Sequence, residues 1–300
     1  MRCLLFALVA FSYLPTVMCA EKLTYTEEIQ MWRKVREEKL RADNGWLTLA
    51  GRFTLKDGAN TFGTGESNDV VCPAVLEGTG PKQLGVIHID SVAKKVTLKL
   101  AAGVSMTSGG KAFTGERVLG TSAEKRDWVG LERLSLHVIE RGGKYTLRLA
   151  DNGSDVRRKF AGCVWYAADE AYKVEAKFVP YPEGKTLSIV NVIDEVSKQR
   201  CPGYAEFQLK GATYKLDAIK DGDGLLFVFR DDTAGDTTYK PGRFVDADRQ
   251  PKANETFTLD FNKAYNPPCA WTDYATCPLP PSQNVLKTRI EAGEKSRAKR

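Results

Sequence analysis

The chain has 300 residues, of which 42% are hydrophobic and 10% aromatic, and its formal net charge is +6. This composition excludes a disordered chain, and the length suffices for one large β domain or two smaller ones. Most of the positive charge lies at the ends, in Arg2 and in residues 287–300, so the remainder is close to neutral and we expect no nucleic-acid partner.

The amino terminus has the pattern of a secretory signal. Arg2 precedes an apolar run over residues 4–14, and a small-residue cleavage site follows at Cys19 and Ala20. This pattern predicts a signal peptide over residues 1–19 and a secreted or periplasmic protein. Cys19 could also carry a lipid anchor, although the methionine before it disfavours this alternative. No later stretch approaches about 20 apolar residues, so we expect no transmembrane segment.

A single helix is predicted after the signal peptide, over residues 23–45. Thr24 and Glu27 have the spacing of a capping box, and apolar residues recur behind them at near-helical spacing. Asn44 and Gly45 form a helix stop signal, which predicts the end of the helix there.

Everything after this helix has the pattern of strands. Short runs alternate between apolar and polar residues or are wholly apolar, and Gly-rich turns separate them. The runs cover residues 46–49, 86–89, 95–100, 134–139, 145–149, 172–179, 187–193, 204–209, 213–216 and 225–229. Gly142 and Gly143 between two of these runs predict a tight hairpin.

The predicted fold class is therefore all-β. One N-terminal helix is followed by a β-sandwich over residues 46–151 and by a second β-rich sandwich or barrel over residues 152–285. A basic tail over residues 286–300 ends the chain.

The most unusual segment is the run from Asp260 to Pro281, which contains five prolines and two cysteines. No helix tolerates this proline density, so we expect one fixed, irregular conformation that closes the second β domain as a clasp.

Four strings carry a resemblance to a known family. They are Asn44 to Leu47, Asp57 to Gly63, Arg141 to Tyr145, and the run from Asp260 to Pro281 with Leu286 and Glu291 to Glu294 behind it. With these strings most of the mature chain resembles the bacterial and archaeal family known as domain of unknown function 1684. The family implies no activity, because its function is not established.

A second resemblance covers residues 46–151. Phe62-Gly63-Thr64 and the string from Ser67 to Val71, followed by short strands, are similar to a forkhead-associated domain. That resemblance implies a β-sandwich that binds phosphothreonine through its loops. The family's arginine is replaced here by Thr64, so the forked donor that phosphate requires is missing. We therefore do not expect phosphothreonine binding.

The polar residues of the clasp are the predicted binding residues. Asp260 and Asn262 would share one face of a strand, and Tyr265 and Asn266 stand just before a double proline. Such side chains can line a pocket for a small polar or anionic ligand, and they can equally satisfy backbone groups of the looping segment. Arg148 and Arg243 are the candidates that would bring positive charge to the same surface.

Binding is favoured over catalysis. His88 and His137 each lie between apolar strand residues and are expected to be satisfied or outward-facing, which disfavours a Ser-His-Asp hydrolase. The alternative is a hydrolase-type enzyme that uses Asp260 or Glu291 as acid or base, with Arg243 stabilising charge. No cofactor or metal site is expected.

Five cysteines remain after the signal peptide, an odd number for an exported protein. Cys269 and Cys277 lie close together between prolines, so they are the candidate disulfide. A surface partner near residues 260–284 is the other expected kind of ligand.

Overall fold

The computed structural model describes residues 23–72, 81–122 and 125–297. In this part of the chain most secondary structure is strand, in several sheets, with one long helix at the N-terminal end. The predicted all-β class is confirmed. The predicted signal peptide and the last residues of the basic tail lie outside the described residues. Among the described helices, none combines the length and the apolar composition that a bilayer span requires.

Helix α1, Tyr25–Arg41, begins as predicted and ends earlier than predicted. The Thr24 hydroxyl accepts from the backbone N–H of Glu27, and the Glu27 carboxylate accepts from the N–H of Thr24. This capping box satisfies two of the free donors at the helix start. Ala42 leaves the helical conformation with a ψ of 155°, so the helix stops before the predicted Asn44-Gly45 signal. Residues 46–48, predicted as strand, form the 3₁₀ turn η1, Trp46–Thr48.

The first unit is a sandwich of two sheets whose strands are mostly antiparallel. One has the strand order β1-β11-β10-β9-β6-β7 and the other the order β3-β2-β4-β5-β8. Apolar side chains from both sheets form one shared core. The strands are β1 Leu49–Leu55, β2 Gly58–Gly63, β3 Val70–Val71, β4 Gly85–Asp90, β5 Lys95–Leu100, β6 Met106–Ser108, β7 Lys111–Phe113, β8 Glu116–Leu119, β9 Val129–Leu131, β10 Leu134–Arg141 and β11 Lys144–Asp151.

The second unit follows a connection over residues 152–172 and has its own core. Its sheets have the orders β16-β15-β12-β20, β17-β18-β19 and β13-β14. The connection contains α2 Asp155–Arg158 and η3 Glu170–Tyr172. The strands are β12 Lys173–Pro180, β13 Thr186–Val190, β14 Val196–Arg200, β15 Gly203–Leu209, β16 Ala212–Asp217, β17 Ile219–Asp221, β18 Gly224–Phe229, β19 Arg243–Ala247 and β20 Thr256–Asp260. The 3₁₀ turns η4 Phe261–Lys263, η5 Pro268–Ala270 and η6 Ser282–Asn284 lie in the predicted clasp.

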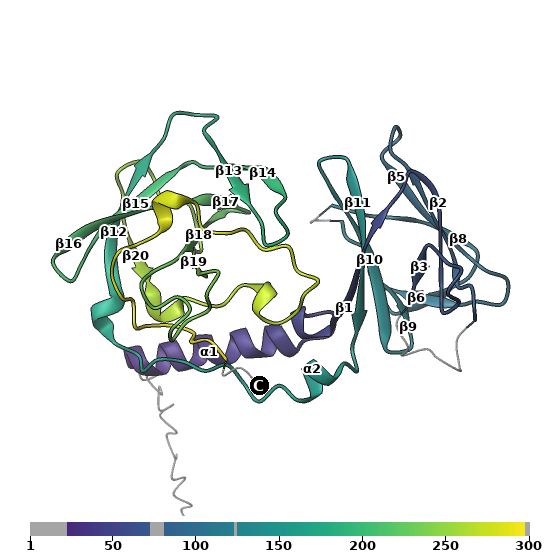
Figure 1. Ribbon diagram of the computed structural model, residues 1–300, viewed down its shortest axis with the longest axis horizontal. Helices are drawn as coiled ribbons and strands as arrows, with labels where there is room; N and C mark the ends of the chain where they lie inside the picture. Colours follow the sequence, from purple (N-terminus) through teal and green to yellow (C-terminus); the bar gives the residue numbers. More distant parts are fainter. Residues whose placement is uncertain (1–22, 73–80, 123–124, 298–300) are drawn as a thin grey trace, which may run out of the picture.

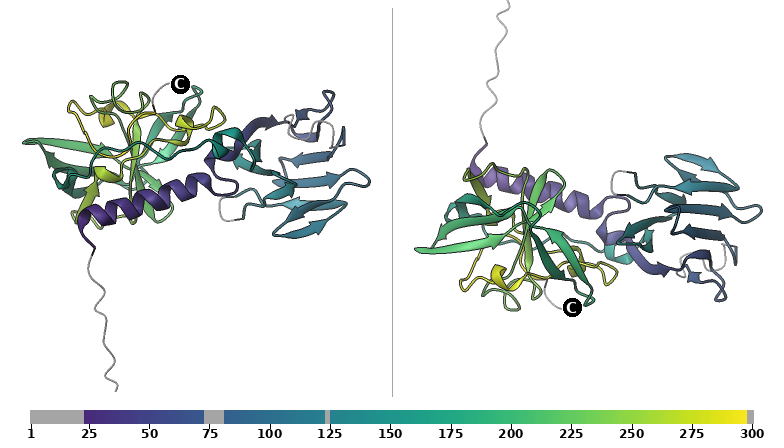
Figure 2. Two further views of the ribbon diagram at one scale, coloured as in Figure 1. Left: turned by 90° about the horizontal axis from the view of Figure 1, so that it is seen from below. Right: turned by 90° about the horizontal axis from the view of Figure 1, so that it is seen from above.

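Helix α1 packs along the second unit, although the whole first unit separates the two in sequence (Figure 1). Figure 2 shows the same arrangement from two further sides, with the first unit beyond the C-terminal end of the helix. The Tyr25 hydroxyl bonds Asp260, 235 residues away, and Arg36 pairs with Glu294. The second unit is therefore built from both ends of the described chain.

One sheet of the first unit is covered on both faces. The first six residues of β10 are all buried, although strands at a sandwich surface usually alternate between buried and exposed. Leu134, Leu136 and Val138 point into the shared core. The alternate residues, which include His137, are buried on the opposite face. This outer face of β10 and β11 carries the most unusual side chains of the molecule.

Candidate functional site

Asp260 and Asn262, two of the predicted binding residues, are tied to helix α1. The Tyr25 hydroxyl donates to Asp260 at 2.9 Å, and the Asn262 amide donates to Tyr25 at 2.7 Å and to the carbonyl of Asp169 at 2.8 Å. Residues 261–263 form η4 rather than the predicted continuous strand, because the Asp260 carboxylate accepts from the Asn262 N–H and turns the chain. These bonds match the alternative in which the two residues satisfy the looping segment.

Tyr265 and Asn266 hold the two ends of the chain together. The Tyr265 hydroxyl donates to Asp246 at 2.8 Å, and its ring lies 4.0 Å from the Arg36 guanidinium. The Asn266 N–H and side-chain amide donate to the buried Glu294 carboxylate at 2.9 and 3.0 Å. Burial raises the pKa of Glu294. Ligand binding by these residues stays a prediction, and most of their polar groups already have internal partners.

Arg243 does not lie near Arg148 on a common surface, which corrects the expected grouping. It is 1% exposed, inside the second unit, where it pairs with Asp231 at 3.2 Å and donates to the carbonyls of Ile290 and Ala292. Asp231 also accepts from the Thr233 hydroxyl at 2.8 Å. Arg243 is therefore a paired, internally bonded cation that fixes the C-terminal segment.

Cys269 and Cys277 lie side by side as free thiols. The Cys269 N–H donates to the Cys277 sulfur at 3.2 Å, and a hydrogen bond from the Cys277 thiol lowers the pKa of Cys269. The predicted disulfide is not formed in the structure. Its formation in the oxidised protein stays a prediction, and a non-reducing peptide mass map tests it.

Arg148 lies in the first unit, in the middle of a row of basic residues. It stands directly opposite Arg52 on β1 and directly opposite His137 on β10. Residues paired in this way project from the same face of a sheet, with Cβ atoms about 5 Å apart. We call Arg52, Arg148 and His137 the cationic row. Like charges opposite one another destabilise a sheet, so this row needs an explanation.

Two members of the cationic row are buried without partners. Arg148 is 6% exposed and His137 is 2% exposed. Within the described part of the chain, the Nε of Arg148 and both ring nitrogens of His137 have no hydrogen-bond partner. His137 was expected to be satisfied or outward-facing, and this prediction is wrong, because the outer face of β10 is covered. His88 is exposed, as expected.

The electrostatic surroundings of the row are positive. Burial lowers the pKa of His137 to about 3, and the charges of Arg126 and Arg148 act in the same direction. Burial also lowers the pKa of Arg148 to about 10, with Arg141 and Arg126 adding to the effect. Burial is the largest cause of both shifts and disfavours the charged forms, and neither Arg52 nor Arg148 forms an ion pair with a carboxylate among the described residues.

Aromatic rings flank the row. The Trp128 ring centroid is 4.0 Å from that of His137, and the Arg148 guanidinium lies 5.3 Å from the Trp46 ring centroid. Trp46 also packs against apolar residues of the second unit, among them Cys277. The row therefore lies on the side of the first unit that meets the second, where buried surroundings strengthen charge interactions.

The sequence contained a signal for this row that the strand patterns alone did not use. A two-residue turn at Gly142 and Gly143 fixes the hairpin register, so His137 must stand opposite Arg148. The pairing of Arg52 with Arg148 depends on the return of β1, which no short-range pattern indicates.

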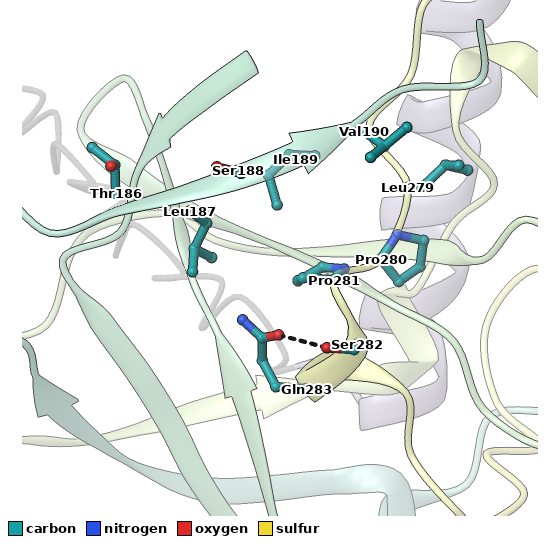
Figure 3. A pocket seen from close by; sticks show the side chains of 10 residues that line it. All are labelled: Thr186, Leu187, Ser188, Ile189, Val190, Leu279, Pro280, Pro281, Ser282 and Gln283. Atoms are coloured by element: carbon teal, nitrogen blue, oxygen red, sulfur yellow. Dashed lines mark hydrogen bonds between the residues drawn. The ribbon is translucent and has the colours of Figure 1, made fainter. Parts of the chain in front are cut away.

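A second feature is a pocket of about 360 Å³ in the second unit, shown in Figure 3. Strand β13 forms one side, and residues 279–283 of the clasp form the other. It is separate from the residues of the cationic row. Among the described residues, no group of three or more His, Cys, Asp or Glu side chains is placed to hold a metal ion.

These observations define a two-unit, all-β protein in which a proline-rich clasp and an N-terminal helix close the second unit. Residues 158–295 match the family model described as "Protein of unknown function (DUF1684)", and the chain belongs to that family through this region. The match is confined to the latter part of the chain, so it is shorter than expected. The forkhead-associated resemblance of residues 46–151 stays a prediction.

Comparison with solved structures found a similar protein, and comparison with curated proteins found none. The chain is similar to an uncharacterised protein of Haloarcula marismortui, known from a solution NMR structure, with 33% sequence identity and a TM-score of 0.40. That similarity covers 46% of this chain and 78% of the other.

Proposed function

We propose that this is an exported, non-catalytic protein that binds a small anionic ligand at the cationic row. The observation that carries the proposal is Arg148, a buried guanidinium with no carboxylate paired to it in the described residues. Burying an unpaired charge is expensive, and proteins retain one mainly where a ligand or partner compensates it.

The chemistry of the row suits an oxyanion. A guanidinium presents several N–H donors in a planar fork that matches carboxylate and phosphate oxygens. Arg52, directly opposite Arg148 and half-buried, can supply a second fork. His137 on the other side can donate from a ring nitrogen. Trp46 and Trp128 would limit the access of water to such a ligand.

Binding explains the row better than catalysis does. The hydrolase alternative needs a carboxylate that is free to exchange protons, whereas Asp260 is bonded to Tyr25 and Glu291 pairs with Arg289 on the surface. The cationic row itself contains no carboxylate and no hydroxyl nucleophile. The proposed role is therefore capture of an anion.

The test measures anion binding by the purified mature protein. Sulfate, phosphate and citrate are titrated by calorimetry and by thermal unfolding, with chloride matching the ionic strength. We expect at least one oxyanion to bind and to raise the melting temperature, and Arg148→Met to abolish both effects. Arg249→Met is the matched control, because Arg249 is a surface arginine paired with Glu255. Equal responses of the wild type and Arg148→Met to every anion would refute the proposal.

A further inference from the structure

On one edge of strand β13, part of the backbone pairs with no neighbouring strand among the described residues. The strand pairs with β14 through its odd-numbered residues, as shown by the bonds from Asn191 N–H to the Glu195 carbonyl and from Cys201 N–H to the Lys185 carbonyl. Backbone groups alternate in direction along an antiparallel strand. The N–H and C=O groups of Thr186 and Ser188 therefore point away from β14.

The clasp forms backbone hydrogen bonds with one part of this edge, and its pairing then ends. Val192 N–H donates to the Cys277 carbonyl at 3.0 Å, and Leu279 N–H donates to the Val190 carbonyl at 2.8 Å. The next bond in this antiparallel register would run from the N–H of residue 281 to the Ser188 carbonyl. Residue 281 is a proline and has no N–H, so the pairing ends there.

The pocket lies where the clasp departs from β13. Figure 3 shows Pro280, Pro281, Ser282 and Gln283 across from the strand. The side chains of Leu187 and Ile189 are buried and provide apolar contact, while Ser282 and Gln283 provide polar groups. A pocket with one open strand edge and mixed walls has the composition of a site for an extended peptide.

The exposed charges across β13 from the open edge are basic, whereas the buried Asp217 carboxylate near the pocket already accepts from Gln283 and from the Tyr181 hydroxyl. Lys198 stands opposite Ser188 and Arg200 stands opposite Thr186, both exposed on β14. Neither of these two basic side chains forms an ion pair among the described residues. Cross-strand neighbours share a face, so both cations lie on the same face of the hairpin as Thr186 and Ser188, one strand away from the open edge.

We propose that an extended acidic peptide segment of a partner protein binds in this pocket as an added strand beside β13, in the line that Pro280 and Pro281 leave open. The bound peptide would exchange backbone hydrogen bonds with Ser188 and direct its carboxylates across the small side chains of Ser188 and Thr186 toward Lys198 and Arg200. This site is independent of the cationic row, and it uses the exposed edge that a sheet otherwise has to protect.

The experiment uses the full mature chain and acetylated pentapeptide amides that carry glutamate at two positions, measured by fluorescence polarisation. The same peptides with lysine in place of glutamate test the charge preference. Ser188→Pro removes one edge N–H without touching the β14 ladder, and Ser188→Ala keeps that N–H as the matched control. Peptides with N-methyl groups at alternate amides test strand addition on the wild-type protein, even if Ser188→Pro does not fold.

We expect the glutamate peptides to bind the wild type and Ser188→Ala alike, and to bind Ser188→Pro about tenfold more weakly. N-methylation in the bonding register should weaken binding by a similar factor. Arg148→Met should leave peptide binding unchanged, which separates this site from the cationic row. Absence of binding by every glutamate peptide, or equal binding of methylated and unmethylated peptides, would overturn the proposal.

Discussion

Two buried arginines show how the same residue serves opposite purposes in this molecule. Arg243 pairs with Asp231 and donates to two carbonyls, so its charge is compensated within the second unit. Arg148 is almost as deeply buried, and its charged neighbours are other arginines, while the histidine opposite it is neutral. The first arrangement stabilises the fold, whereas the second reduces stability until an anion compensates it.

The two arginines should therefore respond to the same substitution with opposite signs. Arg243→Met leaves Asp231 charged and buried, and we expect a loss of roughly 3–5 kcal/mol in unfolding free energy. Arg148→Met removes an uncompensated charge and keeps a similar volume, so we expect a gain of about 1 kcal/mol or more in the absence of anions. Chemical denaturation in low-salt buffer measures both values. A destabilising Arg148→Met would show that the wild-type charge is already satisfied.

His137 should make stability depend on pH. Its folded pKa lies near 3, below the unfolded value of about 6.5, so the unfolded chain binds the extra proton between these values. This contribution is complete above about pH 6.5 and is lost as the pH falls toward 3. Between pH 6.5 and 5 the loss is on the order of 2 kcal/mol.

The measurement compares unfolding free energies of the wild type and His137→Phe across this range. The variant should lack this part of the acid sensitivity, while His88→Gln, at an exposed histidine, should retain it. Parallel curves for the wild type and His137→Phe would contradict a neutral, buried His137. An anion bound at the row should raise the pKa of His137 and so bind more strongly at lower pH.

At the residue scale, the sequence showed which side chains are unusual, but it did not show which residues they contact. Asp260, Asn262 and Asn266 were recognised as unusual, and all three are indeed held in specific contacts. Their partners Tyr25 and Glu294 lie far away in sequence, so no local pattern could name them. The burial of His137 also depends on what covers β10, which alternation within one strand does not show.

At the scale of elements, local signals predicted the start of α1 and most strands, because capping and alternation act over a few residues. The Gly142-Gly143 turn even fixed the register of β10 with β11. The packing of α1 against η4 was not predictable, since its apolar and aromatic residues would suit either unit. The irregular clasp was recognised by its prolines, but its pairing with β13 was not.

The docking of α1 depends on the Tyr25 hydroxyl. It donates to Asp260 and accepts from Asn262, so Tyr25→Phe leaves both groups short of one partner. We expect a loss of about 1–3 kcal/mol and faster amide exchange along α1. Hydrogen exchange followed by mass spectrometry measures this effect. Thr24→Ala, which removes the helix cap without touching η4, should cost about 1 kcal/mol and is the matched comparison.

At the scale of the whole molecule, apolar, hydrogen-bonded and charged contacts join the two units. Trp46 packs against the second unit, the Thr272 hydroxyl donates to the Leu49 carbonyl at 3.2 Å, and Lys144 lies 3.9 Å from Glu195. The cationic row lies on this side of the first unit. A ligand bound there would therefore add contacts where few others join the units, and its binding should stabilise the molecule as a whole.

The position of α1 has a consequence for how the chain is assembled. The first unit is inserted between α1 and the second unit, which together form the host fold. The two ends of the insert lie close together, because the Ser154 hydroxyl donates to the Leu47 carbonyl at 2.7 Å. Replacing residues 49–153 by a short glycine-serine linker should leave a folded host with native-like circular dichroism and cooperative unfolding. Residues 154–297 alone, which lack α1, should not fold cooperatively, since Glu294 would lose Arg36. During synthesis α1 emerges before every strand of the structure, yet its partners Asn262 and Glu294 are made only after the last strand, β20.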